Sequence, residues 1–155
     1  MPDCGAIAEY LDSGVSMVGA SANDHLVPEV FRIWGASLDD GGVLRALISS
    51  DARRTFEQTR EGSLLCMTFA DVLNLRSIQV KGRCVGSAEF PGPADMALME
   101  RYETLLYRKV PLNGTPLALV HAIRPRSVFA VSVLLEEAYE QTPGPAAGKA
   151  LDEGP

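Results

Sequence analysis

The sequence lacks any long uninterrupted hydrophobic run, and this absence excludes a membrane-spanning helix. Its longest apolar stretches, such as residues 128–135, are far shorter than the roughly 20 residues that cross a bilayer. Residues 1–10 also lack the basic start and continuous apolar segment of a secretion signal. We therefore expect a cytoplasmic protein with no membrane partner.

Cysteine, histidine and positive charge are also scarce. Cys4, Cys66 and Cys84 form an odd set without CxxC spacing, which argues against a disulfide framework. His25 and His121 have no acidic or cysteine neighbour at metal-ligand spacing, so we expect no metal site. The chain carries 14 basic and 20 acidic side chains, and its net charge of −6 repels phosphate backbones, which argues against a nucleic-acid partner.

The familiar catalytic motifs are missing as well. The chain contains no GxSxG, no P-loop and no GxGxxG. Neither a protein-only catalytic triad nor a single catalytic acid or base can be named.

What the sequence does contain is the composition of one folded domain. It has 155 residues, of which 46% are hydrophobic and 22% charged. We assign residues 1–140 to a single domain. Residues 141–155, rich in proline, glycine and alanine, have little apolar surface, and we predict a flexible C-terminal tail.

Periodicity and turn residues predict an order of helix, three strands, helix, two strands, helix and strand. Two-residue alternation and β-branched residues place strands at 14–22, 26–38, 43–49, 63–69, 76–90 and 127–139. Helical spacing marks residues 1–12, 52–60 and 96–106, with a loop from Pro111 to the last strand. Because strands and helices do not alternate regularly, we predict a mainly β fold, a six-stranded antiparallel β-barrel with flanking helices.

The strand at 76–84 has one apolar and one polar, basic face. Its alternation places Ile78, Val80, Gly82 and Cys84 on the first, and Ser77, Gln79, Lys81 and Arg83 on the second. The polar face is either a solvated surface or part of a ligand site. Glycine within a strand marks a bulge or a close approach by a ligand or another backbone.

Two further groups could contact an anion or a ring. Ser49 and Ser50 precede a predicted helix with Arg53 and Arg54, and hydroxyls with an arginine fork suit a phosphate. The alternative is a simple capped helix, with Ser50 and Asp51 at its start. On the second strand, Arg32 and Trp34 either flank a planar ligand or form a cation–π surface pair.

Several short strings, in their order along the chain, resemble a known family. They are Ser13-Gly14-Val15, Ile33-Trp34-Gly35, Ile78-Gln79-Val80-Lys81-Gly82, Glu100-Arg101-Tyr102 and Glu140-Gln141-Thr142-Pro143-Gly144-Pro145. The chain resembles the pyridoxamine 5′-phosphate oxidase-like family of FMN-binding split barrels. The resemblance covers most of the sequence.

This resemblance implies a homodimer with FMN in clefts between the subunits. Residues Arg32, Ile33 and Trp34 would meet the isoalloxazine ring. Ser49 and Ser50 would hold the phosphate with Arg53 or Arg54, and Ser77, Gln79 and Lys81 would line the ribityl and phosphate side. The implied function is an FMN-dependent oxidoreductase of unknown substrate. The alternative is a non-catalytic dimeric split-barrel protein that binds haem, a deazaflavin or another ligand.

Overall fold

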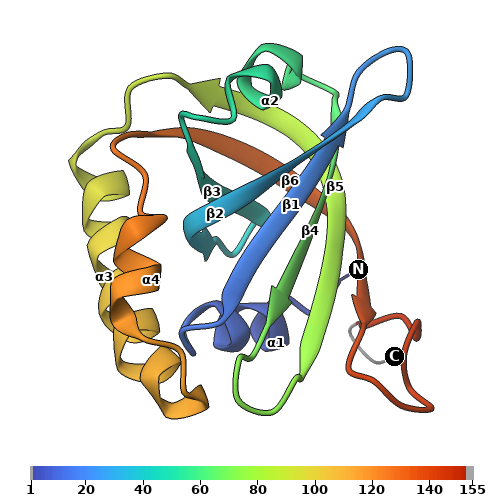
Figure 1. Ribbon diagram of the computed structural model, residues 1–155. Coiled ribbons are helices and arrows are strands. Elements are labelled where there is room, and N and C mark those ends of the chain that lie inside the picture. Colours follow the sequence, from blue (N-terminus) through green and yellow to red (C-terminus); the bar gives the residue numbers. More distant parts are fainter. Residues whose placement is uncertain (1, 153–155) are drawn as a thin grey trace.

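Six antiparallel strands of this computed structural model close into a barrel (Figure 1). The structure describes residues 2–152. The strands pair in the order β1-β2-β3-β6-β5-β4, so every strand has two neighbours. Their bounds are β1 Ser16–Ala22, β2 Pro28–Leu38, β3 Val43–Ser49, β4 Leu64–Ala70, β5 Ser77–Ala88 and β6 Val128–Glu140. The predicted mainly β, six-stranded antiparallel barrel is therefore confirmed.

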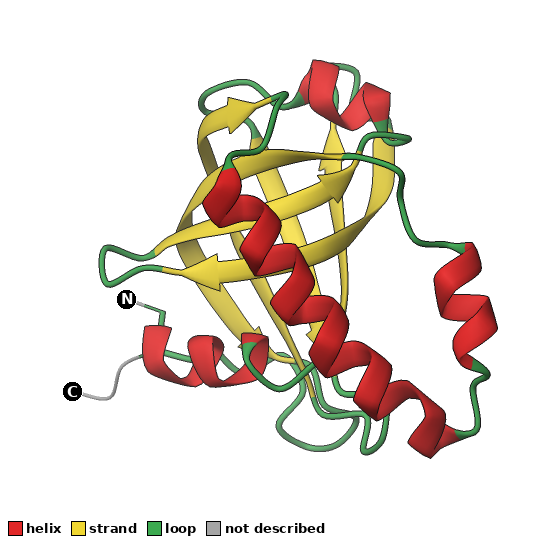
Figure 2. Ribbon diagram, turned by 90° about the vertical axis from the view of Figure 1, so that its left-hand side faces the viewer, coloured by secondary structure: helices red, strands yellow, loops and turns green. Residues whose placement is uncertain are grey.

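Helices cover both ends of the barrel and one side. Helix α1, Cys4–Leu11, lies at one end, and α2, Arg53–Gln58, lies over the other (Figure 1). Helix α3, Pro93–Lys109, crosses the outside of the barrel and packs mainly on β2 (Figure 2). Between residues 2 and 152, no helix combines the length and the apolar character that crossing a bilayer requires.

The loop predicted between α3 and the last strand is wrong in part. It contains a 3-10 turn, Val110–Asn113, followed by a further helix, α4, Leu117–Ala122. Pro111 and Pro116 mark the starts of both elements rather than an irregular loop. Helix α4 is only six residues long and buries only Val120, so its apolar spacing is too short to reveal a helix in the sequence.

The predicted alternation of β5 is confirmed from Ile78 to Cys84, whereas Ser77, which was predicted on the polar face, is buried. Ile78, Val80 and Cys84 are at most 2% exposed and lie in the barrel core. Gly82 shares this face, and a Cβ atom there would lie 2.1 Å from the carbonyl oxygen of Leu134. The strand pairing shifts by one residue between Lys81 and Gly82. Gly82 thus accommodates the backbone of β6 at a bulge, and its presence needs no ligand.

The described part of the C-terminal segment lies beside β6 and the start of α1. The backbone N–H of Gly148 donates to the carbonyl of Glu140 at 2.7 Å, and that of Leu151 to Ala138 at 2.8 Å. The N–H of Asp3 donates to Leu151 at 3.0 Å. The domain limit at residue 140 and the flexibility of the tail stay predictions, and residues 153–155 lie outside the described part.

Candidate functional site

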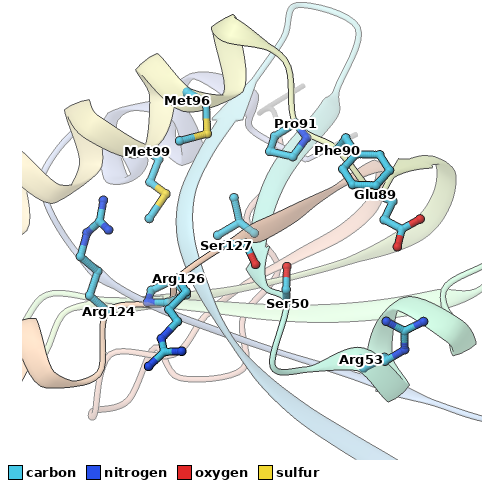
Figure 3. A pocket seen from close by; sticks show the side chains of 12 residues that line it. Ser50, Arg53, Glu89, Phe90, Pro91, Met96, Met99, Arg124, Arg126 and Ser127 are labelled. Atoms are coloured by element: carbon cyan, nitrogen blue, oxygen red, sulfur yellow. The ribbon is translucent and has the colours of Figure 1, made fainter.

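A pocket of about 390 Å³ opens at the end of the barrel that α2 covers (Figure 3). This volume falls in the range of roughly 300–1,000 Å³ that is usual for small-molecule sites. Its walls come from α2, the β5–α3 connection, α3 and the segment before β6. The lining residues are Ser50, Arg53, Glu89, Phe90, Pro91, Met96, Met99, Arg124, Pro125, Arg126, Ser127 and Val128.

The pocket combines apolar walls with a polar centre. Met96 and Met99 approach from α3, and the hydroxyls of Ser50 and Ser127 lie near the centre of the lining residues (Figure 3). The N–H of Ser50 donates to the carbonyl of Ser127 at 3.0 Å, which ties the end of β3 to the start of β6. Both hydroxyls are thus held at the adjoining ends of β3 and β6, where they can bind a polar group of a ligand.

The three arginines of the pocket differ in how their charge is used. Arg124 donates two hydrogen bonds to Glu103, at 2.6 and 3.2 Å, and this pairing raises the pKa of Arg124. Arg53 pairs with Glu57 at 3.3 Å on an exposed surface, where such a contact contributes little. The guanidinium of Arg126 forms no hydrogen bond or ion pair with any residue from 2 to 152. Arg126 is therefore the cation that is free for a ligand.

Two of the four predicted phosphate ligands line this pocket. Ser50 and Arg53 are in its wall, whereas Ser49 and Arg54 adjoin it in sequence and are not among its lining residues. The predicted helix cap is wrong, because α2 begins after Ala52 and has no side-chain cap. Asp51 instead lies 3.3 Å from the Ser49 hydroxyl, so its carboxylate contacts one of the predicted ligands.

The segment Arg32 to Trp34 lies on the same end of the barrel but offers little side-chain surface. Ile33 lies opposite Ile48, one residue before Ser49, and is fully buried. Trp34 is 1% exposed beneath α3, with its ring edge-on to Tyr102 at 6.4 Å. The Arg32 guanidinium lies 5.8 Å from the Trp34 ring centre. A ligand could therefore meet only Arg32 and the backbone here.

The third predicted group, Ser77, Gln79 and Lys81, lies far from the pocket within one subunit. Lys81 is opposite Glu137 on β6, whereas Ser49 is opposite Val128 on the same strand. These β6 residues are nine positions apart, or about 30 Å along an extended strand. One copy of the chain does not bring the two predicted groups together.

The charge of Lys81 is already compensated on the outside of the barrel. Its ammonium lies 3.2 Å from Glu137, and the Tyr139 hydroxyl donates to the same carboxylate at 2.9 Å. Hydrogen bonding to Glu137 raises the pKa of Lys81, and the bonds from Tyr139 and Lys81 lower the pKa of Glu137. In this arrangement Lys81 suits a neutral, hydroxyl-rich group better than a second anion.

The sequence interpretation missed most of the pocket. Arg126 lies in the stretch predicted to be a loop, and Ser127 is the first residue of the predicted last strand. The sequence marks Met96 and Met99 only as the apolar face of a helix. The run Arg124-Pro125-Arg126-Ser127, directly before a strand, is the signal that could have marked this site.

Comparisons with known proteins show the fold. No protein-family model matches the sequence, and neither does any curated protein. Among solved structures, an F420 reductase matches with a TM-score of 0.53 at 17% identity, over 84% of this chain and 93% of that one. HupZ of Group A Streptococcus matches with a TM-score of 0.55 at 11% identity, over 93% of this chain and 98% of that one. A putative pyridoxamine 5′-phosphate oxidase of Lactobacillus delbrueckii matches with a TM-score of 0.51 at 14% identity, over 85% of this chain and 88% of that one.

These proteins and the chain share one fold along nearly their whole lengths. The resemblance to pyridoxamine 5′-phosphate oxidase-like split barrels is therefore confirmed in the fold. Identities of 11–17% do not transfer an activity.

Proposed function

We propose that this protein is a homodimeric flavoprotein that binds FMN at the pocket end and serves as an oxidoreductase of unknown substrate. The observation that carries the proposal is the position of Ser50 and Arg53. The chemistry of these residues and the family resemblance both marked them as candidate phosphate ligands, and they line a ligand-sized pocket beside the unpaired Arg126. The shared fold supports the same assignment.

The chemistry of this end of the barrel suits a phosphate monoester. Serine hydroxyls donate to phosphate oxygens, and guanidinium groups give charge-assisted bonds of roughly twice the strength of neutral ones. Arg53 is exposed and bonded only to Glu57, so a phosphate can replace that contact at little cost. Asp51 opposes an anion at Ser49, which makes Ser50, Arg53 and Arg54 the stronger ligands.

A dimer follows if Ser77, Gln79 and Lys81 also contact the flavin. Lys81 and Ser49 pair with β6 residues nine positions apart, about 30 Å of extended strand, so a second copy of the chain would bring the two groups to the same cofactor. The outer face of β1, β2 and β4 provides an apolar surface beside Lys81, with Val18, Val30 and Leu64 being 39%, 74% and 57% exposed. Cys66 on this face lies opposite both Ala20 and Lys81. An exposed apolar face of this kind fits an interface between identical subunits.

When bound, FMN supplies the electron-transfer chemistry, and the protein supplies its position and hydrogen bonds. In this proposal Ser50, Arg53 and Arg54 anchor the phosphate, and the backbone near Arg32 supports the ring. The proposal assigns no residue of the described part of the chain as a catalytic acid or base.

Quenching of FMN fluorescence on titration with the purified protein tests the proposal. We expect binding that raises the melting temperature, and at least a roughly tenfold weaker Kd for Arg53→Ala/Arg54→Ala. Arg108→Ala, at an exposed position near the far end of α3, is the matched control and should bind like wild type. A colourless protein whose fluorescence titration and melting temperature show no response to FMN would contradict the proposal.

A deazaflavin is the second candidate cofactor, because the fold is matched by an F420 reductase as well. Parallel titrations with F420, FMN and haem separate these cases. Tighter binding of F420 than of FMN would favour the deazaflavin, and a Soret band with no flavin response would favour a haem-binding module.

A further inference from the structure

The pocket contains more apolar surface than the proposed phosphate anchor requires. Met99, with 3% of its surface exposed, and Met96, with 41%, form a wall on the α3 side, and Phe90 and Pro91 line the β5–α3 connection. Pro125 and Val128 complete the apolar lining. Methionine side chains are flexible and polarizable, so they adapt to aromatic or aliphatic bodies of varied shape.

Charge in the pocket is distributed unevenly. Arg124 and Arg126 lie on one side of the two serines, and Glu89 lies on the other with Phe90 (Figure 3). The charge of Arg124 is balanced by Glu103, at 2.6 Å, so Arg126 contributes the uncompensated positive charge on that side. On the other side Arg53 lies with Glu89, so opposite charges offset one another there, and Arg126 marks the place for one further anionic group.

We propose that this pocket binds an organic monoacid with an apolar or aromatic body. Its carboxylate pairs with Arg126 and accepts from the Ser127 hydroxyl, and its body packs against Met96 and Met99. The identification of this acid as the substrate rests on the proposed flavin function, whereas its binding does not.

Arg126 is the specificity-determining residue in this arrangement. A guanidinium can bind a carboxylate with two parallel hydrogen bonds, which a neutral alcohol of the same shape cannot form. Acids should therefore bind more tightly than the matched alcohols, and the difference should depend on Arg126. The apolar contact with the methionines should be common to both ligands.

Methionine methyl groups report on this pocket directly. The chain has five methionines, of which Met96 and Met99 line the pocket, whereas Met17 and Met67 are buried in the barrel. In methyl-¹³C-methionine protein without flavin, we expect trans-cinnamate to shift the Met96 and Met99 signals and leave Met17 and Met67 in place. Met96→Leu and Met99→Leu assign the two signals.

Affinities from the same titrations test the role of Arg126. Cinnamyl alcohol should bind about tenfold more weakly than cinnamate to wild-type protein. Arg126→Gln should weaken cinnamate binding about tenfold and leave the alcohol within about twofold. Arg126→Lys should recover part of the loss, and Arg108→Gln should have no effect. Unchanged Met17 and Met67 signals verify that each variant is folded.

The outcomes separate this inference from the flavin proposal. Absence of Met96 and Met99 shifts with cinnamate, or equal affinities for acid and alcohol, would overturn the inference even if FMN binds. Shifts with the expected acid preference in a protein that does not bind FMN would support the acid site and contradict the flavin proposal alone.

Discussion

The two ends of the barrel use charged side chains in opposite ways. At the α1 end, Lys109 contacts Asp71 at 2.6 Å, with side chains only 17% and 14% exposed, and also donates to the carbonyl of Ser13 at 2.9 Å. Arg76 lies over the ring of Tyr10 at 5.4 Å. At the α2 end, Arg53 is exposed and Arg126 is unpaired within the described residues. Charges that are paired and sheltered stabilise the fold, whereas open ones can bind a ligand.

The barrel wall that connects the two ends should be the most sensitive to substitution. Gly82→Ala places a methyl group against the backbone of β6, where its Cβ would lie 2.1 Å from a carbonyl oxygen. We expect a loss of about 3 kcal/mol in the free energy of unfolding, from urea denaturation. Gly86→Ala on the same strand meets no atom within 4 Å and is the control. Equal losses for both variants would show that the bulge does not require this close contact.

The α1 end should lose stability when its sheltered pair is broken. Lys109→Met leaves the Asp71 carboxylate without its partner, and we expect a loss of about 2 kcal/mol in the free energy of unfolding. Glu57→Gln removes the partner of Arg53 in an exposed pair and should change stability by less than about 0.5 kcal/mol. Similar losses for the two variants would remove the distinction between the ends.

Acid should weaken the α1 end through Asp71. Burial alone raises the pKa of Asp71, but hydrogen bonds from Lys109 and from the N–H of Leu73 outweigh it and hold the pKa below its ordinary value. Because the folded pKa is lowered, this stabilisation is complete above the ordinary value of about 3.9 and is lost as the pH falls through the folded pKa. The free energy of unfolding of Asp71→Asn should therefore fall less between pH 5 and pH 2 than that of wild type. Identical pH profiles would contradict this role.

The smallest effect on stability is expected at the α2 end. Arg126→Gln removes no intramolecular contact of the guanidinium in residues 2–152, so its free energy of unfolding should stay within about 0.5 kcal/mol of wild type. A loss comparable to that of Lys109→Met in urea denaturation would mean that Arg126 has a structural role.

The same contrast explains what could be predicted from the sequence. The barrel could be predicted, because the alternation of apolar and polar residues in segments such as 76–84 and turn residues such as Gly41-Gly42 reflect local conformational preferences. Ser50 and Arg53 could be recognised as candidate ligands of an anion, because their chemistry is evident from neighbouring positions, and they line the pocket. Arg126 could not be recognised from the sequence as an unpaired cation. That depends on Arg124, rather than Arg126, pairing with Glu103, which is 21 positions away in the sequence.

One subunit does not bring together the two groups of residues that were predicted to contact the cofactor. The resemblance implies that Ser77, Gln79 and Lys81 contact the same FMN as Ser49 and Ser50, but the β6 partners of Lys81 and Ser49 are nine positions apart, about 30 Å of extended strand. A sequence pattern identifies a polar strand face without indicating which copy of the chain it faces. Local sequence patterns thus do not predict how the subunits assemble.

The most direct test of the account is therefore subunit complementation. Arg53→Ala/Arg54→Ala and Gln79→Ala/Lys81→Ala should each lose FMN binding as homodimers, with folding verified by thermal melting. In a mixed dimer, one of the two clefts would combine intact Arg53 and Arg54 from one subunit with intact Gln79 and Lys81 from the other. Random reassociation of equal amounts should then restore about a quarter of the wild-type FMN sites, measured by fluorescence titration, because half of the dimers are mixed. Wild-type binding by the Gln79→Ala/Lys81→Ala homodimer, or no recovery on mixing, would contradict a cofactor site shared between two subunits.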